Sequence, residues 1–238
     1  NSLTTGVRNT IVGSQSGLAL ATGGYNTILG GGAGKTTTDV DSCVMIGYGA
    51  CADGNMTSGA DGTVAIGYQA LTALTSGTNN TVVGYQAADA MTTANYNTAF
   101  GYQALSAETV GHTATAFGDR ALGLQNKASD ANTENVGVGF FAGYNNVTGT
   151  ANTYIGFEAG KGATGQSNSD NVGVGNQAFL SITTGGDNTA LGVAAGDALL
   201  TGNNNVFLGK HAGGATTLVD EAVCIGWAAG NGVMDANA

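Results

Sequence analysis

Asn97-Thr98-Ala99-Phe100-Gly101-Tyr102-Gln103-Ala104-Leu105 is the stretch of sequence that decides the fold. A nearly intact copy, Thr63–Leu71, lies two repeats earlier. The glycine of this motif, here called the repeat glycine, recurs along the whole chain at Gly13, Gly30, Gly47, Gly67, Gly84, Gly101, Gly118, Gly139, Gly156, Gly175, Gly192, Gly209 and Gly226. Nine of the twelve intervals are 17 residues. A fixed period of this kind predicts a solenoid with one coil per repeat.

Three intervals are longer, at 20, 21 and 19 residues. They fall within Ala50–Thr63, Leu122–Asn135 and Lys161–Asn171, where Gly, Asp, Asn and Ser accumulate. These are turn-forming residues, so we expect the extra residues to form surface loops on the solenoid.

Two positions before the repeat glycine are apolar or β-branched in every coil. Position −1 holds Val12, Leu29, Ile46, Ile66, Val83, Phe100, Phe117, Val138, Ile155, Val174, Leu191, Leu208 and Ile225. Position −3 holds Thr10, Thr27, Val44, Val64, Thr81, Thr98, Thr115, Val136, Thr153, Val172, Thr189, Val206 and Val223. This alternation predicts a short strand with both positions on one face. We expect that face to point into the coil.

Position −2 then faces outward, because successive side chains of a strand alternate. Its occupants are Ile11, Ile28, Met45, Ala65, Val82, Ala99, Ala116, Gly137, Tyr154, Gly173, Ala190, Phe207 and Cys224, and none is charged. Such a stripe favours burial by a second copy of the chain, and a parallel homo-oligomer keeps all coils in register. The alternative is a wider coil in which position −2 packs against a second strand of its own chain.

Small and amide residues mark the turns of each coil. Position +3 is Ala in twelve repeats and Ser16 in the other, which indicates a tight corner. The invariant repeat glycine indicates a positive φ or a close backbone approach. Asn occupies position −4 nine times, at Asn9, Asn26, Asn80, Asn97, Asn135, Asn152, Asn171, Asn188 and Asn205. We expect these amides to form a hydrogen-bonded ladder along the solenoid.

Composition excludes several classes of protein. Proline is absent from the 238 residues, 42 are glycine and only 9% are charged. Sixteen acidic and six basic side chains give a net charge of −10, which repels nucleic acid and anionic membrane surfaces. The apolar runs are far shorter than the roughly 20 residues that span a bilayer. We therefore expect neither a nucleic-acid partner nor membrane insertion.

The consensus Asn-Thr-Ala-Ile-Gly-Tyr-Gln-Ala-Leu resembles the repeats of phage tail-fibre and related bacterial surface-fibre proteins. It is also distantly similar to the head repeats of trimeric autotransporter adhesins. This resemblance covers essentially the whole chain and implies a parallel homotrimer in an extracellular or virion appendage that attaches to a host-surface glycan or protein receptor. We expect one β-solenoid domain over residues 1–238, a segment of a longer fibre protein.

Residues that could carry chemistry do not form a recognised motif. Acidic side chains such as Asp39, Asp41, Asp53, Asp61 and Asp130 lie in loops and insertions, away from a repeated register that would pair them across coils.

His112 and His211 stand alone, and Cys43, Cys51 and Cys224 have the spacing of free thiols that fill small apolar positions. We expect no catalytic residues, no cofactor and no metal; calcium at Asp39, Asp41 or Asp53 is the alternative, although neither the EF-hand nor the nonapeptide calcium-roll pattern is present.

Position +1 is the column most available for contacts. Its aromatic members are Tyr48, Tyr68, Tyr85, Tyr102, Phe140, Phe157 and Trp227. They are candidate surface contacts, because an aromatic ladder can stack sugars or partner side chains, while packing between coils selects the same residues.

The sequence thus predicts an all-β, parallel β-solenoid of about 13 coils that serves as a structural or adhesive shaft and is not an enzyme. Two alternatives remain. An ice-binding solenoid uses stacked Thr columns, which here are interrupted by Val and expected to face inward. A glycan-degrading tailspike needs two carboxylates about 5 to 9.5 Å apart.

Overall fold

Each repeat forms one coil with a three-residue strand directly before its repeat glycine. The computed structural model describes residues 6–232 and has thirteen such coils, which confirms the predicted parallel β-solenoid. The strands are β1 (Thr10–Val12), β2 (Thr27–Leu29), β3 (Val44–Ile46), β4 (Val64–Ile66), β5 (Thr81–Val83), β6 (Thr98–Phe100), β7 (Thr115–Phe117), β8 (Val136–Val138), β9 (Thr153–Ile155), β10 (Val172–Val174), β11 (Thr189–Leu191), β12 (Val206–Leu208) and β13 (Val223–Ile225). A 3₁₀ turn, η1 (Ser58–Ala60), lies in the first insertion.

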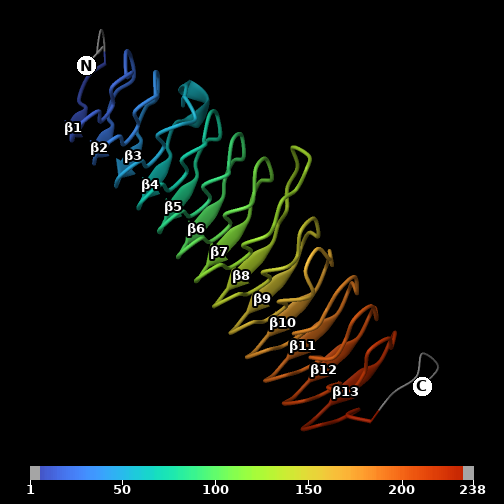
Figure 1. Ribbon diagram of the computed structural model, residues 1–238. Helices are drawn as coiled ribbons and strands as arrows, with labels where there is room; N and C mark the ends of the chain where they lie inside the picture. Colours follow the sequence, from blue (N-terminus) through green and yellow to red (C-terminus); the bar gives the residue numbers. More distant parts are fainter. Residues whose placement is uncertain (1–5, 233–238) are drawn as a thin grey trace. The chain divides into compact units, whose positions relative to one another are not determined.

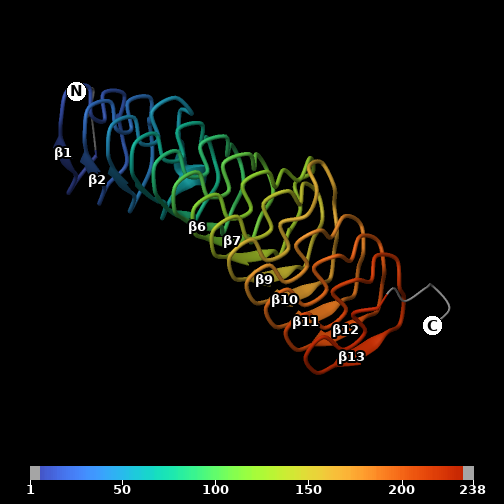
Figure 2. The ribbon, with the colours of Figure 1, turned by 60° about the horizontal axis from the view of Figure 1, so that its bottom comes forward.

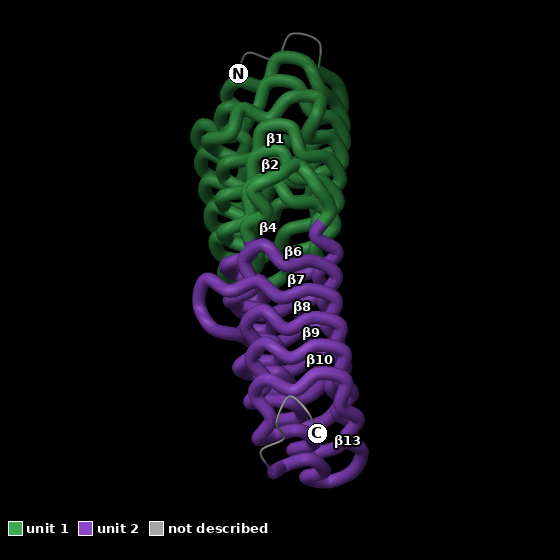
Figure 3. Tube along the Cα trace, turned by 90° about the vertical axis from the view of Figure 1, so that its right-hand side faces the viewer, with its two compact units in different colours: residues 1–114, 126–132 green, residues 115–125, 133–238 purple. Residues whose placement is uncertain are grey.

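The chain divides into two compact units, shown in different colours in Figure 3. Unit 1 comprises residues 1–114 and 126–132 and carries β1 to β6, and unit 2 comprises residues 115–125 and 133–238 and carries β7 to β13. Within each unit the strands follow chain order, lie side by side and pair in parallel (Figures 1 and 2). Their register is one repeat: in unit 2, Thr189 pairs with Val206, and Val206 with Val223.

Hydrogen bonds between coils continue beyond the strands. In unit 1 the N–H of Thr98 donates to Ala114 at 2.9 Å, and the N–H of Gly101 donates to Val83 at 2.8 Å. Gln103, in the turn that follows, donates its N–H to Tyr85 at 2.9 Å. Because turn residues share the ladder, nearly a whole repeat is bonded to its neighbour although the strand has only three residues.

Both the backbone conformation and the close approach of the next coil require the repeat glycine, as its invariance predicts. At all thirteen positions φ lies between +119° and +147°, a region closed to residues with a Cβ. A Cβ at Gly192 would also lie 2.6 Å from the carbonyl oxygen of Gly209 in the next coil, and one at Gly84 only 2.1 Å from that of Gly101. Conformation and coil spacing therefore both exclude any other residue.

The expected orientation of the strands was wrong. The middle residue of a strand, at position −2, points into the coil: Ile28, Ala65 and Phe207 are fully buried. Positions −3 and −1 point outward, and Val12 and Ile225 are 63% and 64% exposed. The alternative, in which position −2 packs within its own coil, is the correct one, although it packs on turn residues and not on a second strand.

The interior of the coil is too narrow for the bulky residues at position −1. Position −2 shares the interior with the buried small residue at position +3 and with position +4 of the same coil. In three of the four coils that have Ala at position −2, as at Ala65 and Ala99, position +4 is a buried leucine such as Leu71 or Leu105. The fourth, Ala190, faces Gly196, whose space the rings of Phe179 and Phe207 occupy. The inward column is consequently less bulky than the outward one, which is why apolar content alone points to the wrong face.

Aromatic residues at position −2 require glycine at position +4. A Cβ on Gly213 would lie 2.4 Å from the Phe207 ring, and a Cβ on Gly160 would lie 2.3 Å from the Tyr154 ring. The reverse arrangement occurs in the coil where Phe179 stands at position +4 and Gly173 at position −2. Side-chain volume is thus exchanged between two positions of one coil, as close packing of a thin core requires.

The asparagine ladder forms as predicted at all nine positions. In unit 2, Asn188 donates its Nδ2 to the carbonyl of Gly202 at 2.8 Å and to Oδ1 of Asn171 at 3.0 Å. Its Oδ1 accepts the backbone N–H of Asn205 at 3.0 Å. Eight of the nine amides are buried, Asn9 being partly exposed, and each bonds to the next coil twice, so the ladder satisfies turn groups that no strand reaches.

Asn188→Ala should destabilise the protein by at least about 2 kcal/mol, since a buried donor or acceptor left unsatisfied costs about 1–3 kcal/mol. Urea unfolding followed by circular dichroism measures the loss. The control is Thr184→Ala, an exposed position for which a change within about 0.5 kcal/mol is expected. A similarly small change for Asn188→Ala would contradict the structural role of the ladder.

Exchange of volume between Phe207 and Gly213 can be tested by a double-mutant cycle. Phe207→Ala alone should cost about 3–5 kcal/mol through the cavity it leaves. Adding Gly213→Leu recreates the pairing of Ala99 with Leu105, which tolerates the same left-handed backbone. The double variant should regain more than half of the lost unfolding free energy. Additive losses would show that the two positions do not share one space.

Candidate interaction surface

The first and third residues of every strand form one outward face in each unit, here called the outer stripe. It contains seven threonines, and all its other members are Val, Leu, Ile or Phe. No member carries a charge. Large members remain accessible, such as Leu191 at 49% and Val223 at 68%. Contiguous apolar surface of this kind is uncommon on monomeric soluble proteins and marks an interaction site.

In-register pairing arranges the outer stripe as straight columns. Thr189, Val206 and Val223 succeed one another in one column of unit 2, and Leu191, Leu208 and Ile225 in the other. Parallel strands in a sheet lie about 4.8 Å apart, so side chains of one column touch along the sheet. The stripe is therefore a regular surface and not a scatter of exposed residues.

Aromatic rings at position +1 stack along the coils. In unit 1, Tyr48, Tyr68, Tyr85 and Tyr102 form a ladder whose successive centroids lie 5.6, 5.0 and 5.3 Å apart. All four are exposed.

In unit 2, Phe140 stacks on Phe157 at 5.3 Å, and Trp227 is 78% exposed. The structure places all seven predicted contact residues at the surface and joins six of them into two stacks. A contact role for them stays a prediction.

A second ladder, at position +2, was not foreseen from the sequence. Gln103 donates its Nε2 to Oε1 of Gln86 at 3.3 Å, and Gln86 donates to Oε1 of Gln69 at 3.2 Å. The recurring Tyr-Gln-Ala of the motif could have indicated it, because identical amides one coil apart can bond as asparagines do.

The expectation that acidic residues share no register was wrong for two of them. Asp41 and Asp61 both stand at position −6 of adjacent coils, and Asp41 donates its backbone N–H to Oδ1 of Asp61 at 2.8 Å. The carboxylate of Asp41 accepts the N–H of Gly24 at 2.6 Å. Asp220 caps Asn203 in the same way at 2.6 Å. These carboxylates satisfy turn amides and serve the fold.

His112 is not isolated, contrary to the expectation from spacing. It also stands at position −6, where its Nδ1 accepts the N–H of Asn95 at 2.9 Å. Its Nε2 bonds to the carboxylate of Asp130, which lies in the second insertion. Both residues belong to unit 1, so this pair fastens the insertion to the coil.

Glu108 is a buried carboxylate that spacing could not reveal. Its Oε1 accepts the N–H groups of Thr109, Val110 and Gly111 at 3.0, 3.2 and 2.8 Å, and the N–H of Lys127 reaches it at 3.3 Å. Four backbone donors compensate the buried charge. The side chain therefore organises a turn and offers no free carboxylate.

The three cysteines are free and buried, as expected. Burial raises the pKa of Cys43 to about 11 and raises the pKa values of Cys51 and Cys224 as well. A raised pKa leaves little thiolate at neutral pH, so these groups are poor nucleophiles and poor metal ligands. They act as small core side chains.

Two cations flank one ring in unit 2. The Arg120 guanidinium and the Lys161 ammonium lie 5.4 and 5.3 Å from the centre of the Phe141 ring. Lys161 also donates to Glu158 at 2.6 Å, and this bond, with a second from Gln177, holds the pKa of Glu158 below its usual value. The group is a surface network without an adjacent nucleophile.

Residues 6–232 contain no group of three or more His, Cys, Asp or Glu side chains placed to hold a metal ion. Within the same residues, no helix has the length and apolar character needed to cross a membrane.

The chain was compared with known proteins. No protein-family model, no curated protein and no solved structure matches it.

Proposed function

We propose that this chain is a structural and adhesive shaft segment of an extracellular or virion fibre, similar to a tail fibre, in which parallel copies bury their outer stripes against one another. A homotrimer is the favoured assembly. Such a fibre extends from a particle or a cell and attaches it to a surface, through a glycan or protein receptor.

The single observation that carries this proposal is the uncharged, apolar outer stripe of each unit. Phe100 in unit 1 and Leu191 in unit 2 are about half exposed, although residues of this kind are normally buried. Residues 6–232 supply no segment that covers them. A second copy offers columns of the same chemistry at the same spacing, so a parallel arrangement brings every coil opposite its equivalent.

Two further features support a shaft. The coils are joined around most of their circumference by hydrogen bonds, and the asparagine ladder adds buried bonds between turns, which favours a stiff element. The motif resembles repeats of phage tail-fibre and bacterial surface-fibre proteins and, distantly, trimeric autotransporter heads. Three sheet faces around a threefold axis form a closed apolar centre, which is why a trimer is favoured over a dimer.

Charges on the outer stripe should break the assembly. The wild-type chain is expected to sediment as a trimer, and Leu191→Lys/Leu208→Lys as a monomer, because a desolvated, unpaired charge costs several kcal/mol. Both residues are exposed in the single chain, so circular dichroism should stay unchanged. Thr184→Lys, an exposed change away from the stripe, is the control and should remain trimeric. A wild-type chain that sediments as a monomer would overturn the proposal.

An ice-binding solenoid is the second candidate, and the observed orientation of the strands favours it more than the sequence does. The Thr and Val column at position −3, expected to face inward, faces outward in straight rows, as Thr81 and Thr98 show. Regularly spaced hydroxyl and methyl groups on a rigid face can order water in an ice-like array.

The two candidates make opposite demands on the same stripe, which cannot be both buried and exposed to ice. If the second candidate holds, the chain is a monomer that produces thermal hysteresis and shapes ice crystals, and Thr81→Lys/Thr98→Lys abolishes both effects. Thermal hysteresis is measured by nanolitre osmometry, with Thr184→Lys as the control. A trimer without hysteresis excludes this candidate.

A further inference from the structure

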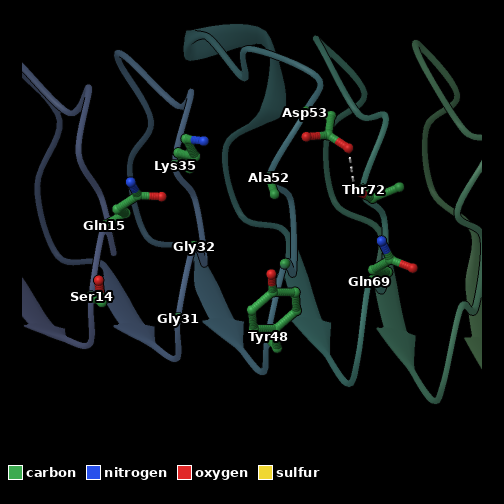
Figure 4. A pocket seen from close by; sticks show the side chains of 11 residues that line it. Ser14, Gln15, Gly31, Gly32, Lys35, Tyr48, Ala52, Asp53, Gln69 and Thr72 are labelled. Atoms are coloured by element: carbon green, nitrogen blue, oxygen red, sulfur yellow. Dashed lines mark hydrogen bonds between the residues drawn. The ribbon is translucent and has the colours of Figure 1, made fainter.

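Both surface ladders of unit 1 stop in adjacent coils. The tyrosine ladder ends at Tyr48, because position +1 of the preceding coil is Gly31. The glutamine ladder ends at Gln69, because position +2 of the preceding two coils is Gly49 and Gly32. The missing side chains leave a groove of about 430 Å³ (Figure 4).

Tyr48 presents one uncovered ring face to this groove. Its other face stacks on Tyr68 with the rings 13° from parallel. On the groove side, a Cβ at Gly31 would lie 3.3 Å from Cδ2 and 3.7 Å from Cε2 of Tyr48, so a group placed there meets the ring along its Cδ2–Cε2 side. Tyr48 is 64% exposed, against 41% for Tyr68. The repeated stacking in the ladder demonstrates that one coil spacing accommodates one flat ring on the next.

Polar groups surround that ring face. Gln69 accepts a bond from Gln86 through Oε1, and it lines the groove together with Gly49, which has no side chain to bond to it. Gln15 and Lys35 line the groove on one side of Tyr48, and Asp53, whose carboxylate accepts a bond from Thr72 at 3.3 Å, lines it on the other (Figure 4). The groove thus combines an aromatic platform with amide, ammonium and carboxylate groups.

We propose that this groove binds a neutral pyranose ring, stacked on Tyr48 in the place of the ring that Gly31 lacks. A pyranose has a face of C–H groups that packs on an aromatic ring, and hydroxyls around its edge that bond to side chains such as Gln15, Gln69 and Asp53. An aromatic side chain offers these polar groups fewer hydrogen-bond partners than a saccharide does, so the saccharide fits the lining better.

The saccharide is neutral because the surroundings disfavour an acidic one. The chain carries a net charge of −10, and Asp53 lies in the groove opposite the one lysine that lines it. A carboxylated sugar would be repelled by the Asp53 carboxylate and by the net negative charge of the chain. The inference depends only on unit 1 and is independent of the assembly proposed above.

Saturation-transfer difference NMR on the whole chain tests this proposal. The probes are methyl β-D-glucopyranoside, methyl β-D-galactopyranoside and methyl N-acetyl-β-D-glucosaminide, each supplied in millimolar excess. N-acetylneuraminic acid serves as an acidic comparison and p-cresol as an aromatic one. At least one neutral sugar should show transfer, strongest at the C–H protons of one face, and the acidic sugar should bind more weakly.

Two variants locate the signal in the groove. Tyr48→Ala removes the platform and should weaken binding at least about tenfold, the equivalent of about 1.4 kcal/mol. Gly31→Tyr extends the ladder by one ring, fills the slot and should abolish transfer. Tyr96→Ala is the matched control, since Tyr96 is an exposed tyrosine of unit 1 outside the groove, and should leave binding unchanged.

The possible outcomes decide the proposal either way. Transfer to a neutral sugar that both groove variants lose supports it, whatever the oligomeric state in the same sample. No transfer to any neutral sugar overturns it, as does transfer that Gly31→Tyr leaves intact. Stronger transfer to p-cresol than to the sugars would identify an aromatic side chain as the occupant and would overturn it as well.

Discussion

The stacking of one coil on the next, in register and at a single backbone spacing, is the constraint on which the rest of this structure depends. The repeat glycine sets it, because its backbone passes so near the glycine of the next coil that a Cβ at Gly84 would lie 2.1 Å from the oxygen of Gly101. Once coils stand at that distance, identical side chains fall above one another. Ladders of asparagine, glutamine and tyrosine then follow, each bonding or stacking at the same interval.

The interior of each coil is also narrow, and its small volume determines which side chains point inward. Two positions divide one small interior, so a phenylalanine at one of them requires a glycine at the other, as Phe207 and Gly213 illustrate. Bulky aliphatic residues at the strand ends have no room within and are turned outward. The fold therefore creates its own apolar surface, and the proposed assembly of parallel copies rests on that surface. The ladders are interrupted at Gly31 and Gly49, and the groove left beside Tyr48 is where we propose that a ring ligand takes the position of a side chain.

The same geometry uses several acidic side chains to satisfy backbone groups. Asp41, Asp61 and Asp220 cap turn amides, and Glu108 is enclosed by four backbone donors. Solenoid turns expose backbone groups in every coil, and carboxylates and amides at recurrent positions satisfy them. Backbone bonding accordingly explains these four carboxylates, and the aromatic and apolar columns remain as the surfaces available to partners.

The sequence by itself determined the repeat, the parallel strands, the buried corner at position +3, the need for glycine and the asparagine ladder, because each depends on spacing along the chain and on the chemistry of one residue type. Only the tertiary structure decided which face of the strand is the core. Alternation distinguishes two faces but does not say which one is inside, and the more apolar face was the wrong choice here. The fold likewise decided the pairing of His112 with Asp130, because an insertion lies between these residues in the sequence. It also decided the groove beside Tyr48, because the groove forms where side chains are missing from the neighbouring coils. The physical reason is that the interior volume available to side chains is set by the closed coil and its neighbours in space, whereas spacing and residue type are read along the chain.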